Sequence, residues 1–218
     1  MLQKIKTYLP LAIQIVGGLI LGISQYFKML ETLQGVSLVM FLSFEVYLVI
    51  NLLLAMRAHQ ELRNSETRQL IGIYLFWIAM ITLDLSAIWR HGGYRWDLND
   101  SITLIIAALG VVGTLVGARI YNLPLGDPIV KGIVSWFFKA IPQVALGIKI
   151  YAEGGNGTPL PAIIAGHATI ITRLVLMYRS KRKLGWNRAV RGMALSEIAN
   201  EASWVIVTIM WIIRQFSH

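Results

Sequence analysis

The sequence contains no cysteine and few charged residues, and both absences limit what the protein is. Without cysteine there are no disulfide bonds, no thiolate metal sites and no cysteine nucleophile. Charged residues make up 14% of the chain, against roughly 25% in a typical soluble domain. A soluble domain of this length needs polar residues over its whole surface, and long stretches of this chain have none. We therefore expect much of the surface to face lipid.

Familiar catalytic and nucleotide-binding motifs are missing as well. The sequence has no glycine-rich phosphate loop, no HExxH motif and no GxSxG motif, and its four histidines are too scattered to suggest a metal site. Glu45 and His167 are the acid and base that a membrane enzyme would use, but no nucleophile or metal set accompanies them. We expect no enzymatic activity, no cofactor and no bound metal.

Seven apolar runs are long enough to cross a membrane. A transmembrane helix needs about 20 mostly apolar residues, and these runs lack the strict alternation of barrel strands. The fold class predicted is therefore all-α, a polytopic membrane protein, in which the first run stays as a span and is not cleaved as a signal peptide. The runs cover residues 8–27, 36–56, 70–89, 101–120, 129–151, 158–178 and 195–215.

The basic residues predict the orientation of these spans. The net charge is +9, and most lysines and arginines fall in the connections on the side of the amino terminus, above all in residues 179–191. Positively charged loops usually stay in the cytoplasm, so we expect a cytoplasmic amino terminus and an external carboxyl terminus. We expect a multi-pass protein of the cell membrane, with a bacterial inner membrane as the simplest assignment, and no nucleic-acid partner because the charge lies between spans.

A weak internal repeat is visible in the sequence. Gln25, near the end of the first run, precedes Gly35 and a second run, and Pro142-Gln143 precedes Gly157 and another run in the same way. Transporters are often built from two copies of a short helical unit. We therefore interpret the first three spans and the last three spans as two copies of one unit.

The span at residues 101–120 has a geometric role in this interpretation. A unit of three spans ends on the side opposite its start, so joining two copies in the same orientation requires one extra crossing. Three small residues along one side of this span are expected to pack closely against a neighbour; they are Gly110, Gly113 and Gly117. The domains predicted are a first triple-helix repeat at 1–95, a linker helix at 96–125 and a second triple-helix repeat at 126–218.

Ile141-Pro142-Gln143 near the middle of an apolar span, followed by a short glycine-containing loop and another span, resembles the PQ-loop superfamily. That superfamily includes the SWEET sugar carriers, the cystinosin-like lysosomal carriers and the KDEL receptors. The first copy has Ser24-Gln25 in place of the Pro-Gln pair. The resemblance implies a build of three helices, a linker and three helices, transport by alternating access, and a hinge role for Pro142, Gln143 and Gln25.

Physical chemistry supports a bend at the proline. A proline inside a helix removes one backbone hydrogen bond and frees the carbonyl four residues earlier, here that of Phe138. The first span has Gly17, Gly18 and Gly22 instead, which permit either bending or close packing.

Several ionisable residues fall inside the apolar runs. Such a group costs at least about 2.5–3.5 kcal/mol at mid-membrane, so it needs a partner, a water-filled cavity or a function. We predict proton coupling through Asp84, Glu201 and Glu45, with Asp84 foremost because its neighbours along the chain are almost all apolar. The alternatives for Asp84 are a structural ion pair with Arg173 or Lys139 and a capping role at the membrane interface.

The solute-binding residues are predicted from positions that correspond between the two copies. Glu45 then corresponds to His167, and a second pair and two tryptophans correspond in the same way. The tryptophans are expected to stack on a flat-faced solute. The full set is Asn51, Trp77, His167, Arg173, Asn200 and Trp204.

These patterns favour a secondary transporter of a small polar solute such as a sugar or an amino acid, with proton coupling as a further hypothesis. One alternative is a membrane receptor or chaperone that binds a peptide or lipid signal in the same cavity, with Lys139 and Arg173 anchoring a carboxylate. Another is a structural or partner subunit. The partners expected are the solute and membrane lipid, and homo-oligomerisation stays open.

Overall fold

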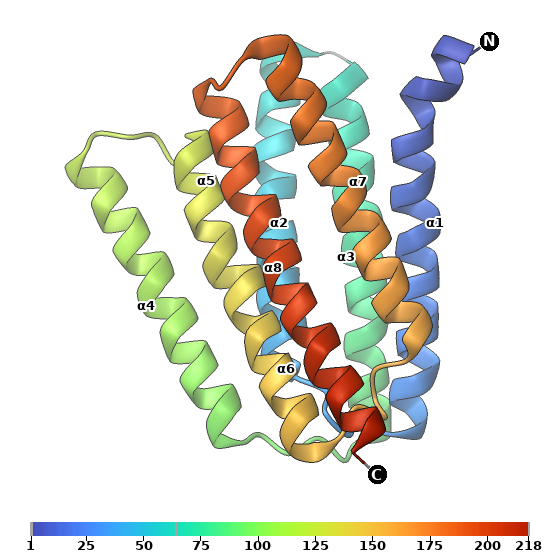
Figure 1. Ribbon diagram of the computed structural model, residues 1–218. Helices are drawn as coiled ribbons and strands as arrows, with labels where there is room; N and C mark the ends of the chain where they lie inside the picture. Colours follow the sequence, from blue (N-terminus) through green and yellow to red (C-terminus); the bar gives the residue numbers. More distant parts are fainter. Residues whose placement is uncertain (1, 64, 218) are drawn as a thin grey trace.

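The computed structural model describes residues 2–63 and 65–217 (Figure 1), and every regular element in these two segments is helical. Seven helical spans in this described part are long and apolar enough to cross a membrane, which confirms the all-α, polytopic fold. The helices are α1 (Leu2–Glu31), α2 (Leu38–Leu62), α3 (Ser65–His91), α4 (Leu98–Ile120), α5 (Pro128–Ser135), the π-helix η1 (Trp136–Ala140), α6 (Ile141–Glu153), α7 (Leu160–Leu184) and α8 (Arg188–Phe216). The short helices α5, η1 and α6 follow one another and form one span.

Local polar residues determine where several helices begin and end. The side chains of Ser37, Asp97 and Asn187 each accept a hydrogen bond from the backbone N–H three residues later, at the starts of α2, α4 and α8. Gly154 and Gly185 follow the last residues of α6 and α7 with positive φ angles. Most helices extend beyond the predicted apolar runs into their polar flanks, whereas α2 and α7 begin two residues inside the predicted runs 36–56 and 158–178.

The spans pack in the same order on both sides of the molecule. Helix α3 packs against both α1 and α2, and α8 packs against both α7 and the α5–η1–α6 span. The two sets meet where α1 contacts α7 and where α2 contacts η1 and α6. Helix α4 lies at the edge of the bundle, mainly against the α5–η1–α6 span (Figure 1). The interpretation of the two sets as copies of one unit stays a prediction.

Close packing, and not bending, explains the glycines of α1. This helix runs without interruption from Leu2 to Glu31. A Cβ atom on Gly17 would lie 2.7 Å from Thr169 of α7, and one on Gly22 would lie 3.0 Å from Met80 of α3. Small residues let helix backbones approach closely in membranes, so these positions bring α1 against both neighbours.

The expectation for the glycines of α4 is right at one position and wrong at two. Gly110 lies directly against the ring of Phe137. A Cβ atom on Gly113 or Gly117 would meet no described atom within 4 Å, so neither position packs closely against a neighbouring helix. Of these three glycines, Gly110 therefore makes the close contact.

The irregularity expected at Pro142 is a π-helix. The N–H of Ile141 donates to the carbonyl of Trp136, five residues earlier, at the end of η1. Pro142 follows directly in the first turn of α6. Such wide turns occur mostly as single interruptions of α-helices, frequently at functional sites. Flexing of this segment as a hinge stays a prediction.

Substitution of Gly35 tests the tight connection between α1 and α2. Gly35 has φ +71°, and a Cβ atom there would overlap the carbonyl oxygen of Gly154. We expect Gly35→Ala to lower the unfolding free energy by about 1–3 kcal/mol or more, because strain and overlap add. Thermal unfolding in detergent measures the effect. Gly113→Ala is the matched control, since its Cβ meets open space and alanine favours helix; an equal loss in both variants would contradict this explanation.

Candidate functional site

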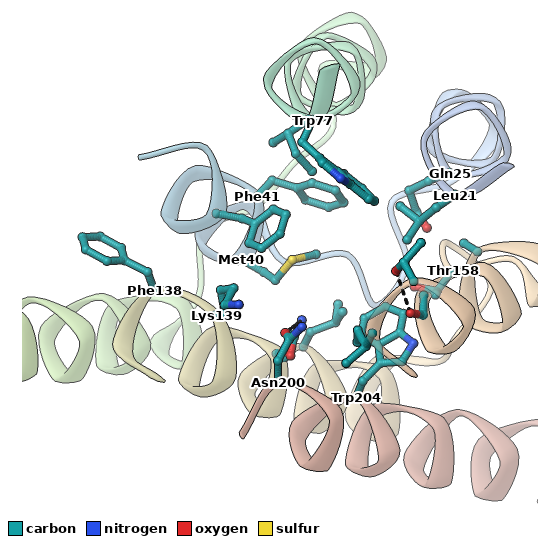
Figure 2. A pocket seen from close by; sticks show the side chains of 18 of the residues that line it. Leu21, Gln25, Met40, Phe41, Trp77, Phe138, Lys139, Thr158, Asn200 and Trp204 are labelled. Atoms are coloured by element: carbon teal, nitrogen blue, oxygen red, sulfur yellow. Dashed lines mark hydrogen bonds between the residues drawn. The ribbon is translucent and has the colours of Figure 1, made fainter. Parts of the chain in front are cut away.

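A cavity lies between the two sets of spans, near the middle of the bundle (Figure 2). Its volume is about 70 Å³, which is room for a few water molecules. Its polar lining residues are Gln25, Lys139, Gln143, Thr158, Thr169, Arg173 and Asn200. Its apolar lining residues are Leu21, Val36, Met40, Phe41, Phe44, Trp77, Ile81, Phe138, Leu146, Ala162, Gly166, Ile170 and Trp204. The lining comes from α1, α2, α3, η1, α6, α7 and α8, so both sets of spans form it.

Four of the six predicted solute-binding residues line this cavity: Trp77, Arg173, Asn200 and Trp204. The other two lie outside its lining. Asn51 donates from Nδ2 to the carbonyl of Tyr47 in its own helix at 2.8 Å. His167 forms hydrogen bonds with α8 instead of facing the cavity.

The two tryptophans lie on opposite sides of the cavity in Figure 2 and differ in their hydrogen bonding. Trp204 donates from Nε1 to the carbonyl of Ile163 at 3.2 Å. Trp77 is 4% exposed, and its Nε1–H has no acceptor among the described residues. A buried donor without an acceptor costs about 1–3 kcal/mol, so Trp77 is a candidate for contact with a bound molecule.

The glutamines of the predicted hinge set both line the cavity, but they have different roles. Gln25 donates to the carbonyl of Gly157 at 2.6 Å and so joins α1 to the loop before α7. Gln143 donates to Asn200 at 3.0 Å and accepts from Ser203, both on α8. The first glutamine links the two sets of spans, and the second holds α6 to α8.

A buried lysine lies at one end of the cavity. Lys139 is 2% exposed. Its Nζ donates to Ser196 at 3.1 Å and lies 3.7 Å from Oε1 of Glu197. The ammonium group also lies 5.0 Å from the centre of the Tyr47 ring, close enough for a cation–π contact. These contacts join η1 to α8 and α2.

Arg173 approaches the same carboxylate from α7. Its NH1 lies 4.0 Å from Oε2 of Glu197, its Nε donates to Gln14 at 3.1 Å, and its guanidinium lies 6.0 Å from the Trp77 ring centre. Two cations therefore share Glu197. The predicted alternative for Asp84, an ion pair with Arg173 or Lys139, is wrong because both partners turn to Glu197.

The three predicted proton-coupling residues lie outside the cavity lining. Asp84 is fully buried, and neither of its carboxylate oxygens has a hydrogen-bond donor in the described part of the chain. Glu45 accepts from Thr82 at 3.0 Å. Glu201 lies 2.8 Å from Nδ1 of His167. Glu201 and Glu197, one turn apart on α8, thus have different partners.

A second ionic network, which the sequence interpretation missed, lies towards the end of the bundle that holds the carboxyl terminus. Nζ of Lys149 lies 2.9 Å from both Asp97 and Asp100. Tyr94 donates to Asp100 at 2.6 Å and accepts from the N–H of Leu38 at 2.9 Å. The network joins α6, the start of α4 and the start of α2. Its signal in the sequence was a lysine within the run 129–151.

The loop residues of this network have shifted acidities. Burial raises the pKa of Tyr94 above its usual value, and its hydrogen bond to Asp100 raises it further. Burial alone would raise the pKa of Asp97 too, but hydrogen bonds from the Asp100 backbone and from Lys149 outweigh it, and the pKa of Asp97 falls below 3.8. The network therefore stabilises the Asp97 carboxylate.

The loops at this same end also pair with each other. The loop from α1 to α2 contributes Gln34, whose carbonyl accepts from the N–H of Gly157 at 2.9 Å and whose side chain donates to the carbonyl of Glu153. Trp211 of α8 donates to the carbonyl of Thr158 at 2.9 Å. Since Thr158 lines the cavity, these contacts cover it at this end.

No protein-family model, curated protein or solved structure matches the chain. Its function is therefore inferred from the cavity and the charged groups around it, and the resemblance to the PQ-loop superfamily stays a prediction.

Removing Lys149 tests the network. We expect Lys149→Met to lower the unfolding free energy by about 3–5 kcal/mol, because it leaves the buried Asp100 without its cation. Lys28→Ala is the matched control: Lys28 pairs with Glu31 at 2.7 Å on the surface, where such a pair contributes about 0–1 kcal/mol. Denaturant unfolding in mixed micelles gives both values, and similar losses would argue against the network.

The difference in unfolding free energy between the wild-type protein and Lys149→Met should depend on pH in one direction. Because the pKa of folded Asp97 lies below its ordinary value of 3.8, its stabilising contribution is present above that pH and disappears as the pH falls through the folded pKa. The stability gap between the wild-type protein and Lys149→Met should therefore be constant from neutral pH down to about 5 and narrow below about 4.

Proposed function

We propose that the protein is a secondary transporter that moves a small polar solute through the bilayer by alternating access. The observation that carries this proposal is the central cavity, because both sets of spans line it and it holds buried polar and charged side chains. Transporters built from two helical repeats bind substrate near the midplane, between the repeats. Lys139, Arg173 and Asn200 supply the polar contacts of this site.

The contacts around the cavity suggest how access alternates. The pairing of Gln34 with Gly157 covers one end, and the hydrogen bond from Arg173 of α7 to Gln14 of α1 joins the two sets of spans towards the other. Movement of α1–α3 against α5–α8 breaks one closure while keeping the other. A cavity of about 70 Å³ has to expand for most solutes, and the π-helix beside Pro142 is a natural place for that adjustment.

The membrane and the orientation belong to the same proposal. The termini lie at opposite ends of the bundle (Figure 1), as an odd number of spans requires. The basic segment at the end of α7 and the start of α8 lies at the end opposite the carboxyl terminus. We propose that this end faces the cytoplasm, because positively charged connections usually stay there. The simplest assignment of the membrane is a bacterial inner membrane.

Filling the cavity tests the transport site. Gly166 lines the cavity, and a Cβ atom there would overlap the indole of Trp204. In liposomes containing the purified protein, we expect Gly166→Ala to reduce solute exchange about tenfold, since overpacking costs about 1–3 kcal/mol. A panel of sugars, amino acids and organic acids identifies the exchanged solute. Gly113→Ala should exchange normally. Saturable binding without flux would contradict transport and favour the receptor alternative.

Neutralising Asp84 tests proton coupling. Asp84 is fully buried without a hydrogen-bond donor among the described residues, which suits a carboxyl group that carries a proton through the membrane. We expect Asp84→Asn to keep solute exchange between equal pH values and to lose accumulation driven by a pH gradient. Glu31→Gln, an exposed change on α1, should keep both. Normal gradient-driven accumulation in Asp84→Asn would remove Asp84 from the mechanism.

A further inference from the structure

The charges beside the cavity do not balance. In the segments 2–63 and 65–217, the ionisable side chains that line the cavity are Lys139 and Arg173, both cations. One carboxylate, Glu197, lies near both of them. Three titratable groups thus leave one positive charge without a counter-ion. Burying an unpaired charge is costly unless a partner neutralises it, so the arrangement favours an anion in the cavity.

Two donors at the cavity are available to a bound molecule, and the nearby Glu197 also has one carboxylate oxygen without a donor among the described residues. Trp77 presents a buried N–H without an acceptor in the described structure. Of the guanidinium nitrogens of Arg173, Nε donates to Gln14, while NH1 lies 4.0 Å from Glu197, beyond hydrogen-bond distance. The planar donor fork of arginine suits a carboxylate. Gln143, in contrast, has both ends of its amide engaged by Asn200 and Ser203.

The rest of the lining is apolar. Phe41, Phe44 and Met40 come from α2, and Trp204 lies opposite Trp77 (Figure 2). A sugar presents hydroxyl groups on every side and needs acceptors as well as donors around it. A doubly charged phosphate would exceed the single unbalanced charge. Both therefore fit this cavity less well than a molecule with one charged end and an apolar body.

We infer that the solute is a small monocarboxylate with an apolar body, whose carboxylate lies between Lys139 and Arg173 and accepts from the indole of Trp77. This inference rests on the proposed function for the site but names its substrate class. The aliphatic or aromatic part of the solute lies among Phe41, Met40 and Trp204.

Three probes of the same shape test the class with the wild-type protein. They are 4-methylpentanoate, 4-methylpentanamide and 4-methylpentylamine, which carry one negative charge, no charge and one positive charge at pH 7. Titration calorimetry in detergent should give the carboxylate at least about tenfold tighter binding than the amide, and no binding of the amine, since like charges exclude it. Equal affinities, or binding of none of the three, would overturn the inference.

Variants of the two cations test whether the carboxylate of the solute lies beside them. Lys139→Gln should weaken carboxylate binding at least about tenfold while leaving amide binding nearly unchanged, because only the charged end meets Lys139. Lys131→Gln, a cation on α5 outside the cavity lining, is the control and should bind like the wild type. If Lys139→Gln does not fold, Arg173→Gln replaces it with the same expectation. Loss of both affinities together would overturn the assigned position.

Flux measurements in liposomes distinguish failure of the substrate class from failure of the proposed transport function. Carboxylate binding that depends on Lys139, without flux into liposomes, would support the substrate class and contradict the transporter. Flux of a neutral or cationic solute, with no preference for 4-methylpentanoate, would support the transporter and overturn the substrate class.

Discussion

Backbone N–H and C=O groups inside a bilayer cannot bond to water, so each must find its partner within the protein. The spans meet this requirement as helices, and the irregular backbone is confined to the short connections at the two ends of the bundle. At Pro142 the chain lacks an N–H, and the preceding turn widens into a π-helix. The same constraint applies to side chains, so every polar group within a span needs a partner or a purpose.

Most polar groups in the spans have partners, and these pairs hold the bundle together. Lys149 joins α6 to Asp100 of α4, and the His167–Glu201 pair joins α7 to α8. Helices in lipid gain little from apolar contact alone, since lipid tails are equally apolar, and packing of small residues and interhelical hydrogen bonds supply the remainder. Helix α4, at the edge of the bundle, is joined to α6 by Asn99 and Asp100 at its start.

Among the described residues, fewer groups lack a partner, and two of these cases concern the proposed function. Asp84 is buried away from the cavity, whereas the indole N–H of Trp77 and the unbalanced charge of Lys139 and Arg173 lie at it. A protein gains no stability from either arrangement. We propose two different tasks for these groups: proton movement at Asp84 and recognition of an anion at the cavity.

The sequence by itself determined the fold class and the seven spans. The length and hydropathy of an apolar run are local properties, and they are enough to decide whether the run can cross the hydrocarbon core of a bilayer. It also indicated four cavity residues as solute contacts, among them Trp77 and Arg173. It did not determine that Glu197 is the partner of Lys139, that Lys149 bonds to Asp100, or that Asp84 is left alone. From the sequence alone, each of these cations could pair with any of several carboxylates. Which side chains meet depends on the rotation of each helix about its axis and on its depth in the bundle. Both depend on packing between segments that are far apart in the chain. Only the tertiary structure therefore decided these pairings.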